Sequence, residues 1–96
     1  MSVINKVIQT RPNVTVGFFE PGTDVVVRLN ALRDLGEIIS YSLAEDTADG
    51  LTRTMTFTFK DINALDNFLN EDVSIDSRAA RKTYCAQNNI VLTTEE

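Results

Sequence analysis

The clearest pattern along the chain is a strict two-residue alternation between Leu51 and Lys60. One set of alternate positions is mostly apolar and includes Phe57 and Phe59, and the other set is a row of threonines that ends in a lysine. Successive strand side chains point to opposite faces of a sheet. The segment 51–60 is therefore predicted to be a strand with one apolar face and one threonine face.

The segment 37–44 alternates in a similar way and is predicted to be a second strand. Its two faces carry, in turn, Ile39, Tyr41 and Leu43 on one side, and Ile38, Ser40 and Ser42 on the other. The acidic loop that follows ends in the turn dipeptide Asp49-Gly50. Because the loop is short, the two strands are predicted to form a hairpin.

Apolar residues at three-to-four spacing predict a helix over 24–35. Asp24 is a good N-cap residue, and Gly36 stands where a glycine commonly follows a helix. The consecutive β-branched residues at 25–27 are restricted in helices. A strand over 25–29 therefore stays open as an alternative.

A second helix is predicted in two pieces. Asp61 is a suitable N-cap for a first piece over 62–70, and the break at 70–73 precedes a second piece that runs to about Gln87. Spacing places four residues on one side of the second piece: Ile75, Ala79, Thr83 and Ala86.

Three further strands are predicted, over 3–10, 13–19 and 90–93. The resulting order is typical of a ferredoxin-like fold with one additional strand near the N-terminus. The sequence thus predicts a single α+β domain over 1–96, with an antiparallel sheet, two principal helices on one face (the second split), and an extra N-terminal strand. The other face of the sheet is expected to be open.

Charge argues against a nucleic-acid partner. The chain has 9 basic and 14 acidic residues, a formal net charge of −5, which repels a phosphate backbone unless basic residues are segregated. The nearest basic group is Arg78, Arg81 and Lys82, and it has Asp72 and Asp76 as neighbours. We interpret this group as a solvated helix face.

The single cysteine, Cys85, has no partner for an internal disulfide. A reducing compartment, hence the cytoplasm, is the simpler expectation. No stretch approaches the roughly 20 apolar residues that a membrane helix needs. We therefore expect no membrane partner.

The usual catalytic residues are missing from the chain. It contains no histidine, which removes the usual general base, the imidazole ligand of zinc and any Ser-His or Cys-His pair. Cys85 is interpreted as a buried free thiol. The acidic loop at 45–50 lacks the closing glutamate of a calcium loop, and the glycines are isolated. No catalytic, cofactor-binding or metal-binding residue is assigned, and no cofactor is expected. These absences favour a protein that is not an enzyme, without deciding the question.

The run Met55-Thr56-Phe57-Thr58-Phe59-Lys60-Asp61-Ile62-Asn63-Ala64-Leu65-Asp66-Asn67-Phe68-Leu69-Asn70-Glu71-Asp72 resembles the antibiotic-biosynthesis-monooxygenase type of dimeric α/β barrel. The resemblance extends over about 37–93 and consists of residue types without an invariant motif. It implies a homodimer packed through open sheet faces, sometimes around a small ligand. Haem-degrading members rely on His or Trp, and this chain has neither. The sequence is also similar in style to small uncharacterised proteins of tailed phages.

Two hypotheses of function follow. The main one is a non-catalytic interaction or structural module that self-associates through its open sheet face, as a cytoplasmic protein or, if phage-encoded, as a virion or accessory protein. The alternative is a small-ligand-binding protein or monooxygenase-type enzyme of the dimeric-barrel kind. Its pocket would lie between the helices and the sheet, or inside a dimer barrel, and would be lined by Tyr41, Thr54, Thr56 and Phe19.

The predicted partner surface is the sheet face that the helices leave open. Threonine suits such a surface because its methyl group packs while its hydroxyl forms hydrogen bonds. The candidate interface residues are Phe19, Ile38, Ser40, Ser42, Thr52, Thr54, Thr56 and Thr58.

Overall fold

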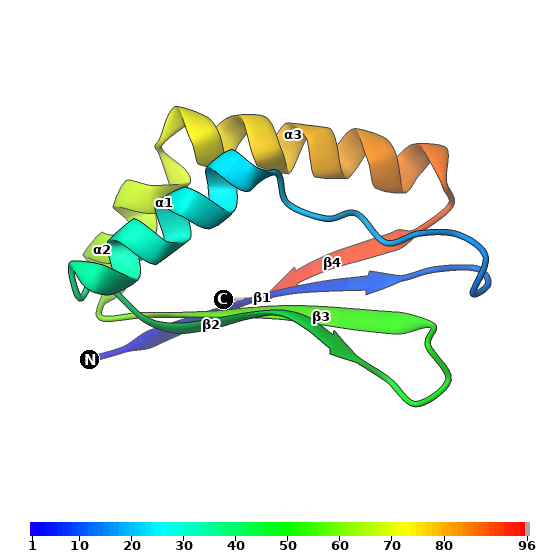
Figure 1. Ribbon diagram of the computed structural model, residues 1–96, viewed down its shortest axis with the longest axis horizontal. Coiled ribbons are helices and arrows are strands. Elements are labelled where there is room, and N and C mark those ends of the chain that lie inside the picture. The colour runs from blue at the N-terminus through cyan, green and yellow to red at the C-terminus, as the bar shows by residue number, and fades with distance from the viewer. Residues whose placement is uncertain (96) are drawn as a thin grey trace.

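The computed structural model describes residues 1–95 as a sheet covered on one face by helices (Figure 1). Along the chain the elements are β1 (Val3–Thr10), α1 (Thr23–Asp34), β2 (Ile38–Asp46), β3 (Thr52–Phe59), α2 (Ile62–Leu69), α3 (Asp72–Gln87) and β4 (Val91–Glu95). The sheet order is β2-β3-β1-β4, and each neighbouring pair is antiparallel. This is the ferredoxin-like arrangement, and it confirms the fold class expected from the sequence.

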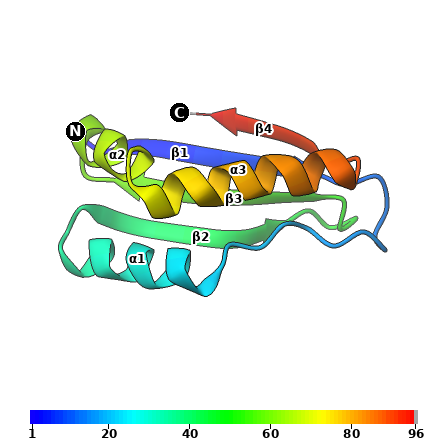
Figure 2. The same ribbon diagram turned by 90° about the horizontal axis from the view of Figure 1, so that it is seen from above.

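All three helices lie on the same side of the sheet (Figure 1). Seen from above, α3 runs over β1 and β3, while α1 lies beside β2 (Figure 2). The split second helix is confirmed, because α2 ends at Leu69 and α3 begins at Asp72. We call the two sides of the sheet the helix-covered face and the open face.

The core lies between α1, α2 and the helix-covered face. Its fully buried side chains include Leu29 from α1, Phe59 from β3 and Leu65 from α2. These residues come from the three segments in which the sequence predicts apolar stripes. The shared core of helices and hairpin is therefore as expected.

Residues 25–29 belong to α1, so the alternative of a strand is wrong. Val25 and Leu29 are buried in the core while Val27 between them is exposed. This is the one-sided burial of a helix, and the packing of Val25 and Leu29 outweighs the weak helix propensity of the β-branched run.

The extra N-terminal strand is not present, because the segment 13–19 is a turn followed by irregular backbone. β1 already pairs with β3 on one side and β4 on the other, which leaves no free edge beside it. The turn is stabilised locally: the Asn13 Oδ1 atom accepts a hydrogen bond from the backbone N–H of Thr15 at 3.0 Å. Such side-chain-to-backbone bonds compete with strand pairing.

The Arg11 side chain holds the start of this segment against the β2–β3 hairpin. Its Nε donates to the carbonyl of Gly50 at 2.7 Å, and a second nitrogen donates to the carbonyl of Val16 at 2.8 Å. Phe18 then lies between two guanidinium groups, those of Arg11 and Arg53, whose carbons are 4.2 and 4.7 Å from the ring centre. The segment is thus fixed on the helix side of the sheet by cation–π contacts and hydrogen bonds.

Candidate ligand pocket

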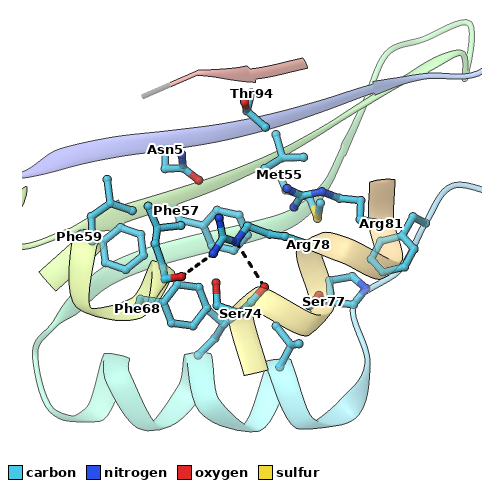
Figure 3. A pocket seen from close by; sticks show the side chains of 17 residues that line it. Asn5, Met55, Phe57, Phe59, Phe68, Ser74, Ser77, Arg78, Arg81 and Thr94 are labelled. Atoms are coloured by element: carbon cyan, nitrogen blue, oxygen red, sulfur yellow. Dashed lines mark hydrogen bonds between the residues drawn. The ribbon is translucent and has the colours of Figure 1, made fainter. Parts of the chain in front are cut away.

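A pocket of about 130 Å³ lies between the helix layer and the sheet (Figure 3). All three helices, strands β1, β3 and β4, and the segment before α1 contribute side chains to it. The apolar part of its wall consists of Val7, Phe19, Pro21, Val25, Leu29, Met55, Phe57, Phe59, Leu65, Phe68 and Leu69. The polar part consists of Asn5, Ser74, Ser77, Arg78, Arg81 and Thr94. A largely apolar wall with a few polar groups is typical of small-molecule sites.

Most of the polar wall comes from the inner side of α3. Ser74, Ser77, Arg78 and Arg81 follow one another at three-to-four spacing, so they share one face of the helix. The sequence predicted a different set of residues on one side of this helix, namely Ile75, Ala79, Thr83 and Ala86. In the structure all four are exposed. The interpretation of Arg78 and Arg81 as a solvated face is also wrong, since both line the pocket.

Arg78 is anchored to the end of α2. One of its terminal nitrogens donates to the carbonyl of Leu69, and its Nε donates to the carbonyl of Ser74 at 3.4 Å. Figure 3 shows this side chain extending from α3 into the space above Phe57. Arg78 therefore forms part of the pocket wall and also satisfies a carbonyl in the last turn of α2.

Arg81 is different because its buried Nε atom has no hydrogen-bond partner within residues 1–95. Burial lowers the pKa of Arg81, the nearby charge of Arg78 lowers it further, and Cys85 opposes the shift. A guanidinium nevertheless stays protonated in proteins. The pocket thus has in its wall a half-buried cation with one buried donor, Nε, that is unused.

Phe19 forms the wall beneath the start of α1, and a buried glutamine fixes it there. The Gln9 side chain is 0% exposed; its Oε1 accepts from the backbone N–H of Phe19 at 2.9 Å, and its Nε2 donates to the Phe19 carbonyl at 3.2 Å. The Phe19 ring also contacts Tyr84, at 5.8 Å between centroids, and the Tyr84 hydroxyl donates to the carbonyl of Gly17 at 2.6 Å. Together β1 and α3 hold this segment in place.

Cys85 is a buried free thiol, which confirms the interpretation from the sequence. Burial raises the pKa of the thiol, and Arg81 only partly offsets that effect. The thiol therefore stays protonated near neutral pH, and its contact with the Gln9 Oε1 at 3.9 Å is a weak one.

The open face carries six of the eight predicted interface residues. Across the β2–β3 pair, Ser40 lies opposite Thr58 and Ser42 opposite Thr56, and the alternation of β3 places its remaining threonines on the same side. The six are Ser40, Ser42, Thr52, Thr54, Thr56 and Thr58. The two threonines that were assigned to the alternative's pocket, Thr54 and Thr56, therefore face away from it.

The other two predicted interface residues lie on the helix-covered side. Ile38 is 1% exposed and belongs to the core, because a register shift at Ile39 adds one residue between the pairs that flank it. A bulge of this kind changes the face of every residue before it. Phe19 lies in the pocket wall because its segment is not a strand, and Tyr41 packs against the core without lining the pocket.

The side chains that β1 and β4 contribute to the open face were not predicted from the sequence. β1 contributes Ile4, Lys6 and Ile8, which pair with threonines of β3, and Glu95 of β4 pairs with Lys6. The open face is thus a mixed surface of threonine and isoleucine, with Lys6 and Glu95 as cross-strand neighbours toward its β4 edge. Pairing order cannot be read from local alternation, so these neighbours could not be found in advance.

In the part of the chain that the structure describes, no helix is long and apolar enough to cross a membrane. Over the same residues, no three His, Cys, Asp or Glu side chains gather as a metal site.

Comparison with known proteins identifies the fold. No protein-family model matches the sequence, and no curated protein matches it. Among solved structures, a candidate antibiotic biosynthesis monooxygenase from Deinococcus radiodurans is similar, with a TM-score of 0.57 and 14% identity over 100% of this chain and 91% of its own. A second candidate antibiotic biosynthesis monooxygenase, from Caulobacter crescentus, has a TM-score of 0.57 and 16% identity over 96% of this chain and 86% of its own.

A more distant similarity is to a dimeric protein of ferredoxin-like fold from Bacteroides fragilis, with a TM-score of 0.41 and 10% identity over 97% of this chain and 94% of its own. The first two structures confirm the resemblance in fold that the sequence indicates. They also overturn the main functional hypothesis, a non-catalytic interaction or structural module with a phage protein as one form of it, because both are candidate antibiotic biosynthesis monooxygenases. They favour the alternative.

Proposed function

We propose that this chain binds a small organic molecule between its helices and its sheet, and acts on it as a monooxygenase-type enzyme of the dimeric α/β-barrel kind. The observation that carries the proposal is the pocket itself, with a largely apolar wall and a few polar groups, most of them from α3. The two solved structures of the same fold, both candidate monooxygenases, support the choice of reaction class.

The size of the pocket limits the ligand. An engineered apolar cavity of roughly 150 Å³ holds one benzene molecule, and this pocket measures about 130 Å³. The enclosed space is therefore about the size of one six-membered ring. Phe57, Phe59 and Phe68 offer aromatic surfaces against which such a ring packs.

Self-association through the open face is part of the proposal. Ile4 and Ile8 stand beside the threonine row and are not covered by any helix of their own chain. A sheet with one uncovered, half-apolar face is a candidate interface, and closed dimers are the commonest soluble assembly. Pairing of two open faces would leave both pockets on the outer sides of the dimer.

The first test is binding. Phenol, as a single-ring probe, is titrated into the protein while the methyl NMR signals of Met55 and Leu65 are followed, since both side chains line the pocket. A saturable shift at these methyl groups is expected. Ser77→Phe, which fills the pocket from α3, should abolish the shift, whereas Thr83→Phe on the exposed side of the same helix should retain it.

The second test is turnover. Monooxygenation places one atom of O₂ in the substrate and reduces the other to water, so two electrons must come from the substrate or an added reductant. Hydroquinone, a single ring that can supply them itself, is incubated with the protein in an oxygen electrode, with and without ascorbate. Protein-dependent oxygen uptake that Ser77→Phe removes and Thr83→Phe keeps is expected. Binding without uptake in either arm would leave a ligand-binding protein and reject the reaction class for this substrate.

A further inference from the structure

The charge of the pocket wall is opposite to that of the protein. The whole chain has a net charge of −5, yet the wall contains Arg78 and Arg81 and, within residues 1–95, no carboxylate. Two cations close together repel each other and are disfavoured by burial. A bound anion would compensate the positive charge of this wall.

Other arginines in the structure show what a partnered guanidinium looks like here. Arg28 binds the carboxylate of Glu71 through two nitrogens, at 2.7 and 2.9 Å, and Arg53 binds Asp46 in the same way and at the same distances. Both pairs are fork-to-fork contacts of the strong, planar type. Arg81 has no such contact, and its Nε is the only buried side-chain nitrogen or oxygen in residues 1–95 without a partner.

The neighbours of Arg81 do not supply the missing acceptor. Arg78 is a cation, and the buried Cys85 thiol is neutral near pH 7 because its pKa is raised. No aromatic ring in the described part of the chain lies under this guanidinium, in contrast to Arg11, Arg33 and Arg53. Roughly nine in ten buried polar groups in native proteins are hydrogen-bonded, so the unused donor of a pocket-lining arginine calls for an explanation, and a ligand anion is one.

We propose that the pocket takes a single-ring organic monoanion, whose carboxylate pairs with Arg81 while its ring lies against the apolar wall. This inference rests on the proposed function, in that the pocket is taken to be the ligand site, and adds the charge and the recognition residue. A planar guanidinium suits a carboxylate, which it binds through two parallel hydrogen bonds. Figure 3 shows Arg81 reaching from α3 toward Met55 in the sheet, so an anion held there would place its ring toward the phenylalanines.

A second depression provides an approach for the anion. It lies between α3 and β4, is lined by Lys82, Cys85 and Leu92, and shares Arg78, Arg81 and Thr94 with the pocket. Lys82 is exposed at this depression. Cations that line an entrance raise the local concentration of anionic ligands, most strongly at low salt.

The test compares two ligands that differ in charge and little in shape, benzoate and benzamide, by isothermal titration calorimetry at pH 7. Wild-type protein is expected to bind benzoate about tenfold or more tighter than benzamide, as a charge-assisted pair predicts. Arg81→Met should lose this preference. Arg33→Met makes the same change at an exposed position of α1 that lines neither the pocket nor the depression, and should keep it.

A stability measurement separates ligand recognition from a structural role of Arg81. If the cation is unpaired in the free protein, Arg81→Met should unfold at the same temperature as wild type or a higher one, and benzoate should raise the melting temperature of wild type alone. Arg81→Lys, which keeps the charge, should retain part of the preference for benzoate.

The outcomes are distinct. If benzamide binds as tightly as benzoate, the anion inference is overturned and the pocket proposal stands. The same holds if Arg81→Met still binds benzoate more tightly than benzamide. An Arg81→Met protein that no longer folds would show a structural role and would also count against the inference. Failure of both ligands, and of phenol, to bind folded wild-type protein would reject the pocket as the ligand site and this inference with it.

Discussion

The two faces of the sheet differ although the same strands build both. On the helix-covered face β3 presents Met55, Phe57 and Phe59, which line the pocket together with the arginines of α3. On the open face the same strand presents threonines, which stand beside Ile4 and Ile8 of β1. The first face is already packed and offers an enclosed site, and the second offers a broad surface.

This comparison has a practical consequence for function. Ligand binding and self-association draw on different side chains of one strand, so single substitutions should separate them. Changes on the helix-covered face should alter folding or ligand binding, and changes on the open face should alter assembly while the monomer stays folded.

The largest effect is expected from Phe59→Ala. The side chain is 1% exposed and packs in the core beside Phe68, and removal of a buried phenylalanine costs about 3–5 kcal/mol of unfolding free energy. Thr58→Ala, one residue earlier on the open face, should cost less than about 1 kcal/mol. Urea unfolding of both variants measures the difference, and similar losses would contradict the division between the faces.

A double change on the open face, Thr54→Lys with Thr56→Lys, should weaken self-association by about 100-fold or more. Two added cations beside Lys6 would have to be desolvated against their counterparts in the partner. Sedimentation velocity over a range of concentrations measures the dissociation constant, and circular dichroism checks folding. A double mutant that still associates like wild type would place the interface elsewhere, and one that unfolds would show that the open face supports the monomer.

The elements with strong local signals could be predicted from the sequence. The hairpin, α1 and the split second helix were all expected within a few residues of their observed bounds. Alternation in β3 is unbroken, and Asp61 does cap α2 by accepting from the backbone N–H of Ala64 at 2.9 Å. Here the local pattern and the tertiary packing agree.

The rest depended on contacts that no local pattern contains. The bulge at Ile39 inverts the face of Ile38, and the segment 13–19, although rich in β-branched residues, has no free strand edge beside β1. A pocket between helices and sheet with Phe19 in its wall was predicted as part of the alternative, but its polar wall was not, because the arginines of α3 were interpreted as a solvated surface. The spacing of Ser74, Arg78 and Cys85 along one helix face was the available signal for this wall. The apolar spacing of Ile75, Ala79 and Ala86 favoured the other side of the helix.

A smaller effect on stability is expected from Gln9→Met. The substitution keeps the volume and removes two hydrogen bonds to the Phe19 backbone, so unsatisfied groups are left and the unfolding free energy should fall by about 1–3 kcal/mol. Because Phe19 lines the pocket, benzoate affinity should fall as well. Gln87→Met, at an exposed position of α3, is the matched control for both measurements, and a Gln9 variant with wild-type affinity would show that this wall does not need fixing.

The smallest effect concerns the β2–β3 hairpin, where Arg53 binds Asp46 at 2.7 Å. This hydrogen bond is the main reason that the pKa of Asp46 is lowered from its ordinary value of 3.8. A carboxyl whose pKa is lower in the folded state adds stability above its unfolded pKa, and loses it as the pH falls through the folded pKa. The carboxylate is partly exposed to solvent, so the pair contributes at most about 1 kcal/mol.

Asp46→Asn should therefore be slightly less stable than wild type at pH 7, and the two proteins should converge as the pH falls from the ordinary carboxyl pKa of 3.8 through the lowered folded-state pKa of Asp46. Urea unfolding at pH 7, 4 and 2.5 follows the difference. Asp34→Asn is the control, because Asp34 forms no ion pair within the described residues. A gap between Asp46→Asn and wild type that does not narrow between pH 7 and pH 2.5 would show that the asparagine disturbs the hairpin for reasons other than charge. If the gap is absent at pH 7, the pair adds nothing, and the hairpin is held by its strand pairing and by the contact of Arg11 with Gly50.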